Sequence, residues 1–193
     1  MSGPGLNRAV FLDRDGILVV PEFRDGRSYA PRRLQNFAIY PEARRNLDRL
    51  KRAGFSLVVV TNQPDVGAGL LERGQLEEMH RLLREALPVD EIAVCCHTRE
   101  DRCACRKPEP GLIHGSADQL RIDLAASYMV GDRASDIEAG ARAGCRTVFV
   151  DLCYTAEPTP DGPTANVSSL GEAVDWILAD SKGGGCEQEY VEG

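Results

Sequence analysis

The chain has 193 residues, of which 42% are hydrophobic and 27% are charged, and its formal net charge is −7. This length and composition are typical of one globular domain with a proper core, and the acidic balance argues against the basic surface that nucleic-acid binding needs. No apolar run reaches the roughly 20 residues that cross a bilayer, and the first residues lack the basic-then-apolar pattern of a secretion signal. We therefore expect a cytoplasmic protein that binds neither nucleic acid nor membrane.

A short apolar run at residues 8–12 is the first predicted strand, and it leads directly into two carboxylates. Asp13 and Asp15 follow it, and Gly16 ends the strand. Two acidic side chains at the end of a buried strand are costly unless a positive group lies beside them. From this stretch alone, an ordinary Asp-Gly turn and a site for a metal ion or substrate are both open.

The next segments alternate between helical and strand patterns. Residues 42–53 carry apolar side chains at helical spacing, residues 56–60 are apolar and β-branched after their first residue, and residues 72–87 form a second amphipathic pattern. A wholly apolar strand is typical of the centre of a parallel sheet, where both faces are covered. Residues 56–60 therefore predict a buried central strand.

The second half continues the alternation, with strands predicted at residues 91–95, 127–130 and 146–150 and helices at residues 110–120, 135–143 and 170–178. Five strands that alternate with helices predict a three-layer, Rossmann-like α/β fold, in which helices cover both faces of a central parallel sheet. Residues 156–164 are rich in proline and predict a surface loop. We expect one domain over residues 1–180 and a disordered tail at residues 181–193.

Polar residues follow three of the predicted strands. Asp13 and Asp15 follow the first, residues 61–63 (TNQ) end the second, and Asp132 with Arg133 follows the fourth. Ligands of such sheets bind at the carboxyl ends of the strands, near the point where the strand order reverses. We therefore expect these side chains to converge on one edge of the sheet.

The paired carboxylates fit the hydrolysis of a phosphate monoester. A carboxylate can be the nucleophile and form an aspartyl phosphate, and a second one can protonate the leaving oxygen and then accept a proton from water. We assign the first role to Asp13 and the second to Asp15. Both are predicted ligands of Mg²⁺, an oxygen-preferring ion that neutralises phosphate charge.

Other strand ends supply the remaining parts of this chemistry. The hydroxyl and amide of Thr61 would bind a phosphate oxygen, and Lys107 would supply a positive charge. Asp132 would complete the magnesium site, and Asp136, one helical turn later, is a candidate for a supporting role. An EF-hand site is excluded because it needs further ligands and a glutamate at loop position 12.

Three cysteines and a histidine crowd into a pattern C-x-H-x5-C-x-C, formed by Cys95, His97, Cys103 and Cys105. A Cys₃His set suits a closed, structural Zn²⁺ site, and alternation in an extended chain directs Cys96 away from it. The alternatives are a redox cluster or plain surface cysteines. We expect zinc to fix the loop that presents Arg106 and Lys107, the two residues after Cys105, to a phosphate.

Four stretches resemble, in order, the motifs of the haloacid dehalogenase (HAD) superfamily of phosphatases, namely FLDRDG, VVVTNQ, CRKPEPG and MVGDRASDIEAG. With the zinc loop, residues 8–151 resemble the D-glycero-D-manno-heptose-1,7-bisphosphate 7-phosphatase family, which is allied to histidinol-phosphate phosphatases. The resemblance implies a Rossmann-like core, Mg²⁺, structural Zn²⁺, a cytosolic monomer and a small sugar phosphate as substrate.

The candidate substrate-binding residues are Arg14, Asn62, Gln63, Arg106 and Arg133. The last two are implied by the resemblance, which gives Arg106 a part in substrate recognition and puts Arg133 beside the phosphate. Alternation in an extended segment directs Arg14 away from the two carboxylates that flank it.

The spacing of the motifs leaves no room for a separate cap domain, so loops must shape the pocket. The polar, glycine-bearing residues 20–29 are the first candidate for such a loop.

The second motif departs from the usual family pattern, which is TNQSG followed by arginine and glycine. Here it runs TNQPDVGAG, with Ala68 in place of the arginine. This departure borders the pocket and leaves another small sugar phosphate, or histidinol phosphate, open as the substrate. For histidinol phosphate, Glu22 or Asp65 would pair with the amine.

Two further hypotheses remain, a DNA 3′-phosphatase and a non-catalytic module held together by zinc. The acidic balance and the absence of a basic or aromatic stripe count against the first. The second is disfavoured because the chain has both carboxylates at the first strand end. It also has the three other groups that phosphate chemistry needs, namely Thr61, Lys107 and Asp132.

Overall fold

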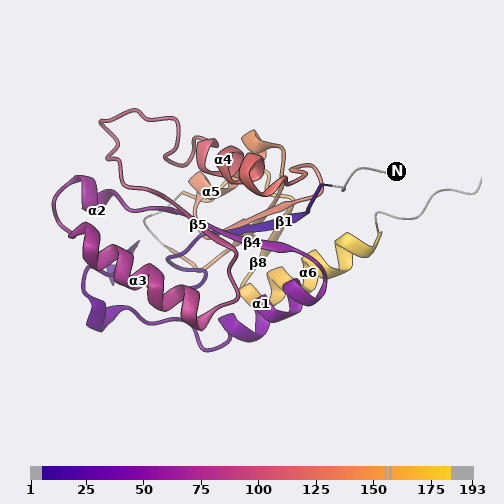
Figure 1. Ribbon diagram of the computed structural model, residues 1–193, viewed down its shortest axis with the longest axis horizontal. Coiled ribbons are helices and arrows are strands. Elements are labelled where there is room, and N and C mark those ends of the chain that lie inside the picture. Colours follow the sequence, from indigo (N-terminus) through magenta and orange to yellow (C-terminus); the bar gives the residue numbers. More distant parts are fainter. Residues whose placement is uncertain (1–5, 155, 157, 184–193) are drawn as a thin grey trace, which may run out of the picture.

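A six-stranded parallel sheet forms the centre of the protein in a computed structural model, which describes residues 6–154, 156 and 158–183 (Figure 1). Each strand pairs in parallel with its neighbours. In spatial order the strands are β5 (Glu91–Cys95), β4 (Ser56–Asn62), β1 (Ala9–Leu12), β6 (Tyr128–Gly131), β7 (Arg146–Val150) and β8 (Ala165–Val167). The predicted parallel α/β sheet is confirmed.

Helices cover both faces of the sheet, which gives three layers (Figure 1). One face carries α1 (Ala43–Arg52), α3 (Arg73–Ala86) and α6 (Leu170–Gly183), and the other carries α4 (Gly111–Leu120) and α5 (Ala134–Ala143). The chain thus folds as the alternating pattern of the sequence predicts, with each amphipathic helix burying its apolar side against the sheet.

The sheet divides the hydrophobic core into two parts, one on each face. Val10 and Leu12 of β1 point into the part that holds α1 and α6, whereas Ala9 and Phe11 point into the part that holds α4 and α5. All four side chains are completely buried. Since successive side chains of a strand face opposite sides, an uninterrupted apolar run is what a strand between two helical layers requires.

The carboxyl end of β1 lies at the point where the strand order reverses. The chain passes from β1 to β4 and β5 on one side, then crosses back to β6 and β7 on the other. Loops that leave neighbouring strands in opposite directions open a crevice at this point. The polar residues that follow β1, β4 and β6 therefore meet at one edge.

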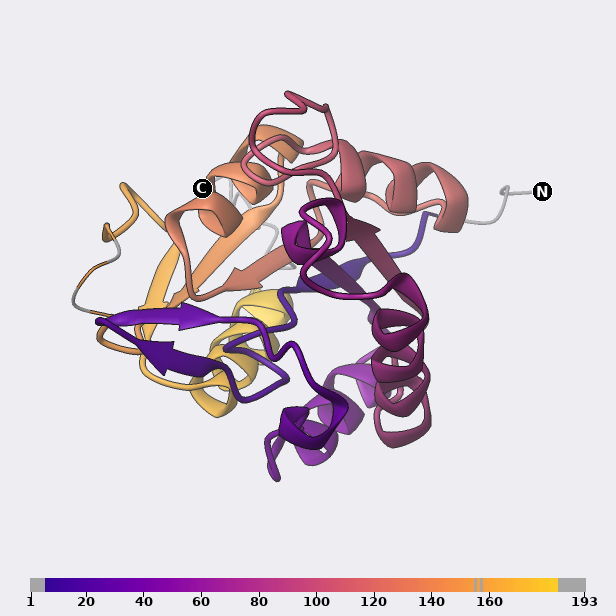
Figure 2. The ribbon, with the colours of Figure 1, turned by 90° about the vertical axis from the view of Figure 1, so that its left-hand side faces the viewer.

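Two small β elements lie where the sequence predicts loops. Residues 20–29 include an antiparallel hairpin of β2 (Glu22–Arg24) and β3 (Arg27–Tyr29), and β8 adds a sixth strand at the sheet edge. The three strands β2, β3 and β8 are each three residues long and partly exposed. They therefore lack the apolar run that marks the interior strands. Figure 2 shows the hairpin, in indigo, on the side of the molecule where the carboxyl ends of the strands lie.

Other boundaries shift by a few residues. β4 continues to Asn62, beyond the predicted end at residue 60, and a short helix, α2 (Pro64–Gly67), follows it. A 3₁₀ turn, η1, covers Leu34–Asn36. α6 runs through Gly183, so the expected disordered tail does not begin at residue 181, and residues 184–193 lie outside the described residues.

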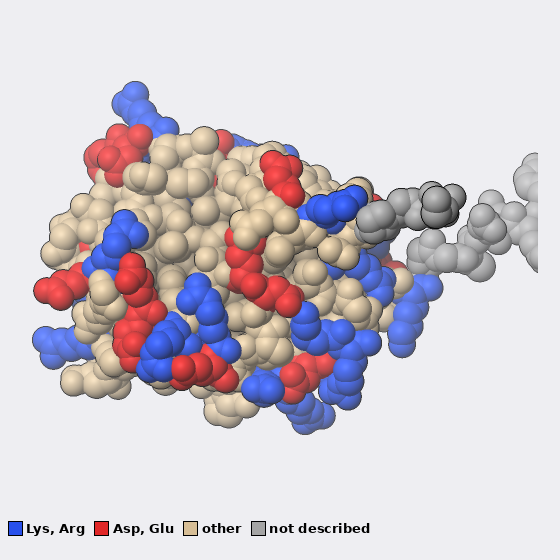
Figure 3. All heavy atoms as spheres, in the orientation of Figure 1, with Lys and Arg blue, Asp and Glu red and all other residues tan. Residues whose placement is uncertain are grey.

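Among the described residues, no helix combines the length and the apolar character that a membrane span requires. On the face drawn in Figure 3, acidic and basic side chains are interspersed, and no extended basic stripe covers that face.

Gly140 brings α5 close to the sheet, and its replacement by alanine tests that packing. A Cβ at this position would lie 2.5 Å from Cβ of Met129 and 2.9 Å from Cγ2 of Thr147. We expect Gly140→Ala to lower the free energy of unfolding by about 1–2 kcal/mol, because overpacking outweighs the gain in helix propensity. Gly115→Ala is the control, since nothing lies within 4 Å of its Cβ position, and it should raise stability by up to about 1 kcal/mol. Urea unfolding measures both, and equal shifts would contradict the packing argument.

Candidate active site

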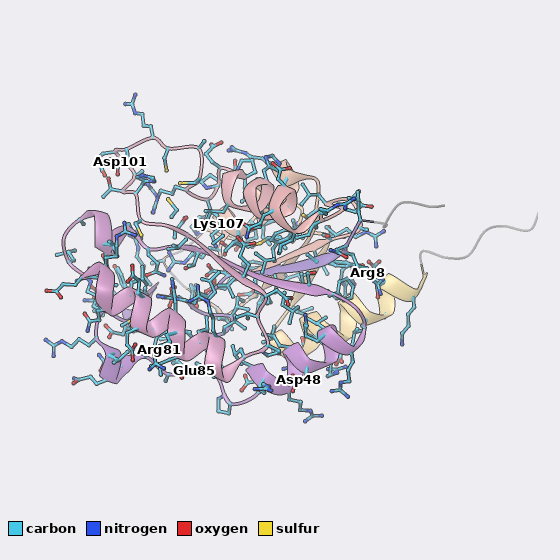
Figure 4. All side chains as sticks on the ribbon, in the orientation of Figure 1. Arg8, Asp48, Arg81, Glu85, Asp101 and Lys107 are labelled. Atoms are coloured by element: carbon cyan, nitrogen blue, oxygen red, sulfur yellow. The ribbon has the colours of Figure 1, made fainter. Side chains whose placement is uncertain are left out.

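The buried ammonium group of Lys107 lies at the centre of the site. Its Nζ is 2.6 Å from Oδ1 of Asp13 and 2.7 Å from Oδ1 of Asp136, and it donates a 2.6 Å hydrogen bond to the carbonyl of Val60. Burial disfavours its charged form, but the two carboxylates raise the pKa of Lys107 above its ordinary value. The lysine is therefore a permanent cation, and Figure 4 labels it below α4.

Asn62, the last residue of β4, fixes the main chain of Lys107. Its side-chain amide donates to the carbonyl of Lys107 at 3.0 Å and accepts from the amide of the same residue at 3.1 Å. Asn62 also lines the cavity above the carboxylates. One residue at a strand end thus determines where the loop lysine enters the site.

Three carboxylates cluster beside the lysine. Oxygen atoms of Asp13, Asp132 and Asp136 lie within 4.8 Å of one another, and Oδ1 of Asp132 is buried without a hydrogen-bond partner among the described residues. Burial, together with the charges of the other two carboxylates, raises the pKa of Asp132 well above its ordinary value. A divalent cation would remove this repulsion, and a set of carboxylate oxygens is what Mg²⁺ prefers.

The carboxylate of Asp15 makes a different set of contacts from those of Asp13 and Asp132, the other two predicted ligands of the metal, and its own place as a ligand stays a prediction. Arg14 donates to its two oxygens at 3.0–3.1 Å, and Nε2 of Gln63 donates to Oδ2 at 2.8 Å. The third carboxylate of the cluster is Asp136 instead. Asp15 nevertheless lines the same cavity as Asp13, so both carboxylates face whatever occupies it.

The side chain of Arg14 is fully buried and pairs with Asp15. This pairing corrects the expectation that alternation directs Arg14 away from the carboxylates that flank it. Nη1 of Arg14 lies 3.2 Å from Nε2 of His80 on α3. A guanidinium group can only donate, so His80 must accept and be neutral. Burial, assisted by the nearby charges of Arg14 and Arg84, lowers the pKa of His80 to about 3.

Gln63 is likewise buried and supports the site from below. Besides its bond to Asp15, its Nε2 donates to the hydroxyl of Thr61 at 2.9 Å. The side chain is completely buried, and the role of Gln63 in substrate binding stays a prediction. The amide links Thr61 to Asp15.

A cavity of about 610 Å³ lies over Asp13 and Asp15. Seven basic side chains line it, namely Arg27, Arg32, Arg99, Arg102, Arg106, Lys107 and Arg133. In a protein with a net charge of −7, this gathering of positive groups creates a local site for anions. The predicted substrate residues Arg106 and Arg133 are among the lining residues.

The hairpin forms one wall of this cavity, as predicted for residues 20–29. Ser28 accepts hydrogen bonds from Nη2 of Arg133 through its carbonyl at 2.6 Å and its hydroxyl at 2.7 Å. Beyond the hairpin, Arg32 forms an ion pair with Asp65 at 2.7 Å across the cavity wall. Sequence reasoning missed Arg32, because neither its residue type nor its position marks it among the other exposed arginines.

The four predicted zinc ligands converge. The sulfur atoms of Cys95, Cys103 and Cys105 are 3.2–3.7 Å apart, and Nδ1 of His97 is 3.3 Å from Sγ of Cys105. These separations are near the roughly 3.7 Å edge of a tetrahedron with Zn–S bonds of about 2.3 Å. Cys96 is absent from the cluster, as alternation predicts. The four residues fit a structural Zn²⁺ ion.

The acceptor role of His80 has a measurable consequence for stability. Its pKa is about 3 in the folded chain, against 6.5 for an ordinary histidine. Between these values the unfolded state binds the extra proton, so stability decreases as the pH falls from 6.5, by about 1.4 kcal/mol per pH unit from this residue. His80→Gln keeps an acceptor for Arg14 and should remove this contribution, which urea unfolding between pH 7 and 5 measures.

His114→Gln is the matched control, since His114 is exposed on α4, and it should keep the slope of the unaltered protein. An unaltered slope in His80→Gln would mean that His80 is not held in its neutral form.

Comparison with known proteins agrees with this geometry. Residues 104–173 match a family model described as HAD-hydrolase-like. The D-glycero-beta-D-manno-heptose-1,7-bisphosphate 7-phosphatase of Helicobacter pylori is 34% identical over 89% of this chain and 97% of its own length, and the protein of the same name from Escherichia coli K12 is 35% identical over 88% and 87%.

Solved structures give the same result. The D,D-heptose 1,7-bisphosphate phosphatase of Bordetella bronchiseptica, crystallised with magnesium and phosphate, superposes with a TM-score of 0.75 at 29% identity, covering 90% of this chain and 99% of that one. A HAD-like phosphatase of Mesorhizobium loti gives a TM-score of 0.74 at 26% identity over 98% and 94%. With carboxylates, lysine and cavity arranged as described, the chain belongs to the HAD superfamily of phosphatases, within the family of the heptose-bisphosphate 7-phosphatases.

Proposed function

We propose that this protein removes the 7-phosphate from D-glycero-D-manno-heptose 1,7-bisphosphate in a magnesium-dependent reaction. The observation that carries the proposal is the position of Asp13, a buried carboxylate that is 2.6 Å from the ammonium of Lys107 and lines a cavity rich in arginine. The substrate is that of relatives about 35% identical to this chain.

In the proposed reaction, the Asp13 carboxylate attacks phosphorus and the bond from phosphorus to the sugar oxygen breaks. The leaving oxygen takes a proton from Asp15, which leaves an aspartyl phosphate on Asp13. Asp15 then removes a proton from water, whose oxygen attacks phosphorus and releases inorganic phosphate. The contacts of Asp15 with Arg14 and Gln63 hold its carboxylate at the cavity surface, where both transfers take place.

The positive charge of Lys107 offsets the repulsion between an anionic nucleophile and an anionic phosphate. Magnesium, held by Asp13 and Asp132, would neutralise further charge on the phosphoryl group. Thr61 lies beside these groups with its hydroxyl fixed by Gln63 at 2.9 Å. Because the donors are held in place before substrate enters, little reorganisation is needed as charge develops.

The lining of the cavity favours a substrate with a second anionic group. Most of its basic residues besides Lys107 come from the hairpin, the loop after it and the zinc loop. Histidinol phosphate would need an acidic partner for its amine, but Asp65 is paired with Arg32 and Glu22 accepts a 2.8 Å hydrogen bond from Asn36. These contacts support a sugar bisphosphate over an amino-alcohol phosphate.

We propose that Zn²⁺ held by the Cys₃His cluster stabilises the loop that carries Arg106 and Lys107. Arg106 donates from Nη1 to the carbonyl of His97 at 3.2 Å, so a ligand of the cluster also positions the arginine. We further propose that the enzyme is a cytoplasmic monomer, as the family resemblance implies, and that it has one domain, which the length of the chain favours.

Replacement of Asp13 tests the catalytic proposal. Asp13→Asn preserves the shape of the side chain but removes its nucleophilic charge, so phosphate release from heptose 1,7-bisphosphate should fall by at least about 10³-fold. Asp118→Asn, on the exposed side of α4, should leave the rate unchanged. Turnover that persists in Asp13→Asn would remove the basis of the mechanism.

The substrate assignment is tested on the same preparation. We expect kcat/KM for heptose 1,7-bisphosphate to exceed that for histidinol phosphate by at least about tenfold, because a second phosphate gains ion pairs of roughly 1.4 kcal/mol or more in this cavity. The reverse order would make histidinol phosphate the better candidate.

Metal analysis tests the zinc proposal. The purified protein should contain about one zinc ion per chain, and Cys103→Ser should lose it, with a lower melting temperature and a lower kcat/KM that added Mg²⁺ does not restore. Cys96→Ser is the control and should retain zinc, since Cys96 is outside the cluster. Full activity in zinc-free protein would show that the loop needs no metal.

A further inference from the structure

Tyr154 contacts the carboxylate cluster from a part of the chain that no catalytic motif covers. Its hydroxyl donates a 2.6 Å hydrogen bond to Oδ2 of Asp132. Tyr154 follows β7, whereas Asp132 follows β6, so the contact joins the segments beyond two neighbouring strands. A tyrosine in this connection has no sequence pattern that indicates such a role.

The ring of Tyr154 is held between the hairpin and the carboxylate. It packs against Phe23 of β2 with the ring centroids 5.5 Å apart and an angle of 57° between the planes. The turn that directs it inward contains Cys153 in the left-handed region, with φ of 58°, and the amide of Cys153 donates to Oδ1 of Asp151 at 2.8 Å. The ring contact with Phe23 and the turn at Cys153 thus direct the hydroxyl at Asp132.

This hydrogen bond makes the two oxygens of Asp132 unequal. Oδ2 accepts from Tyr154, whereas Oδ1 is buried and has no hydrogen-bond partner among the described residues. An unpartnered carboxylate oxygen beside Asp13 is the atom left to bind a cation. The hydroxyl of a tyrosine keeps its proton at neutral pH and can donate this hydrogen bond.

The catalytic turn is packed against the same pair. A Cβ on Gly16, whose φ is 102°, would lie 2.1 Å from Oδ2 of Asp132 and 3.0 Å from the hydroxyl of Tyr154. Glycine is therefore required where the turn after Asp15 meets the tyrosine–aspartate pair. The position of Asp132 relative to Asp13 depends on this contact as well as on β6.

We propose that Tyr154 is a positioning residue for the metal site, which holds Oδ2 of Asp132 so that Oδ1 faces the divalent cation. The proposal takes one assignment from the proposed function, namely that Asp132 is a ligand of the metal. Groups that orient a metal ligand usually matter for affinity, and their loss costs about 10–100-fold. The aromatic contact with Phe23 also joins the metal site to the hairpin that lines the cavity.

Calorimetric titration of Mg²⁺ into the substrate-free protein tests the proposal. Tyr154→Phe keeps the ring and removes only the hydroxyl, and we expect the dissociation constant for Mg²⁺ to rise about tenfold. At saturating Mg²⁺ the kcat of the variant should return to within about threefold of the unaltered protein, since the reacting groups are intact. Thermal melting verifies that the variant is folded.

Tyr128→Phe is a matched control, because the hydroxyl of Tyr128 donates to Oδ2 of Asp180 at the same distance of 2.6 Å, at the other end of β6. Its Mg²⁺ affinity should be unchanged. An unchanged affinity in Tyr154→Phe, or an equal loss in Tyr128→Phe, would overturn the proposal. Because binding is measured without substrate, a protein that fails to hydrolyse heptose 1,7-bisphosphate but loses affinity in Tyr154→Phe would refute the proposed function alone.

Discussion

The ion pair between Lys107 and Asp13, completed by Asp136, is the interaction on which the site depends. Three carboxylates within 4.8 Å of one another are unfavourable in a buried place, and the ammonium group offsets part of their repulsion. The acids come from strand ends and the first turn of α5, which are rigid, but the lysine comes from a loop. The amide of Asn62 therefore has a structural role beyond substrate contact, since it ties that loop to β4 through two hydrogen bonds.

The two carboxylates of the first motif have separate surroundings although one residue separates them. Asp13 faces the lysine and the other acids, whereas Asp15 faces Arg14 and Gln63. In the proposed mechanism Asp13 attacks phosphorus and Asp15 transfers protons. The buried arginine, whose other partner is a neutral histidine, holds Asp15 in place from behind the site.

The apolar runs of the sequence predicted the sheet because each interior strand is covered on both faces, as Val10 and Phe11 illustrate by facing opposite layers. Convergence of Asp13, Thr61 and Asp132 followed from parallel strands alone. The role of Arg14 could not be predicted, because it depends on His80 from a helix distant in the chain. β8 was missed since its three residues are partly exposed, and only tertiary packing distinguishes it from a loop.

Cys95 is both a member of the sulfur cluster and the last residue of β5, where it is paired in register with Asn62 of β4. One anchor of the loop is therefore part of the sheet, and the other, Cys105, directly precedes the two basic residues of the site. Residues 98–102 form the span between these anchors and include two arginines of the cavity wall. Because one anchor belongs to the sheet and the other to the sulfur cluster, these two arginines reach the cavity from a segment that is held at both ends.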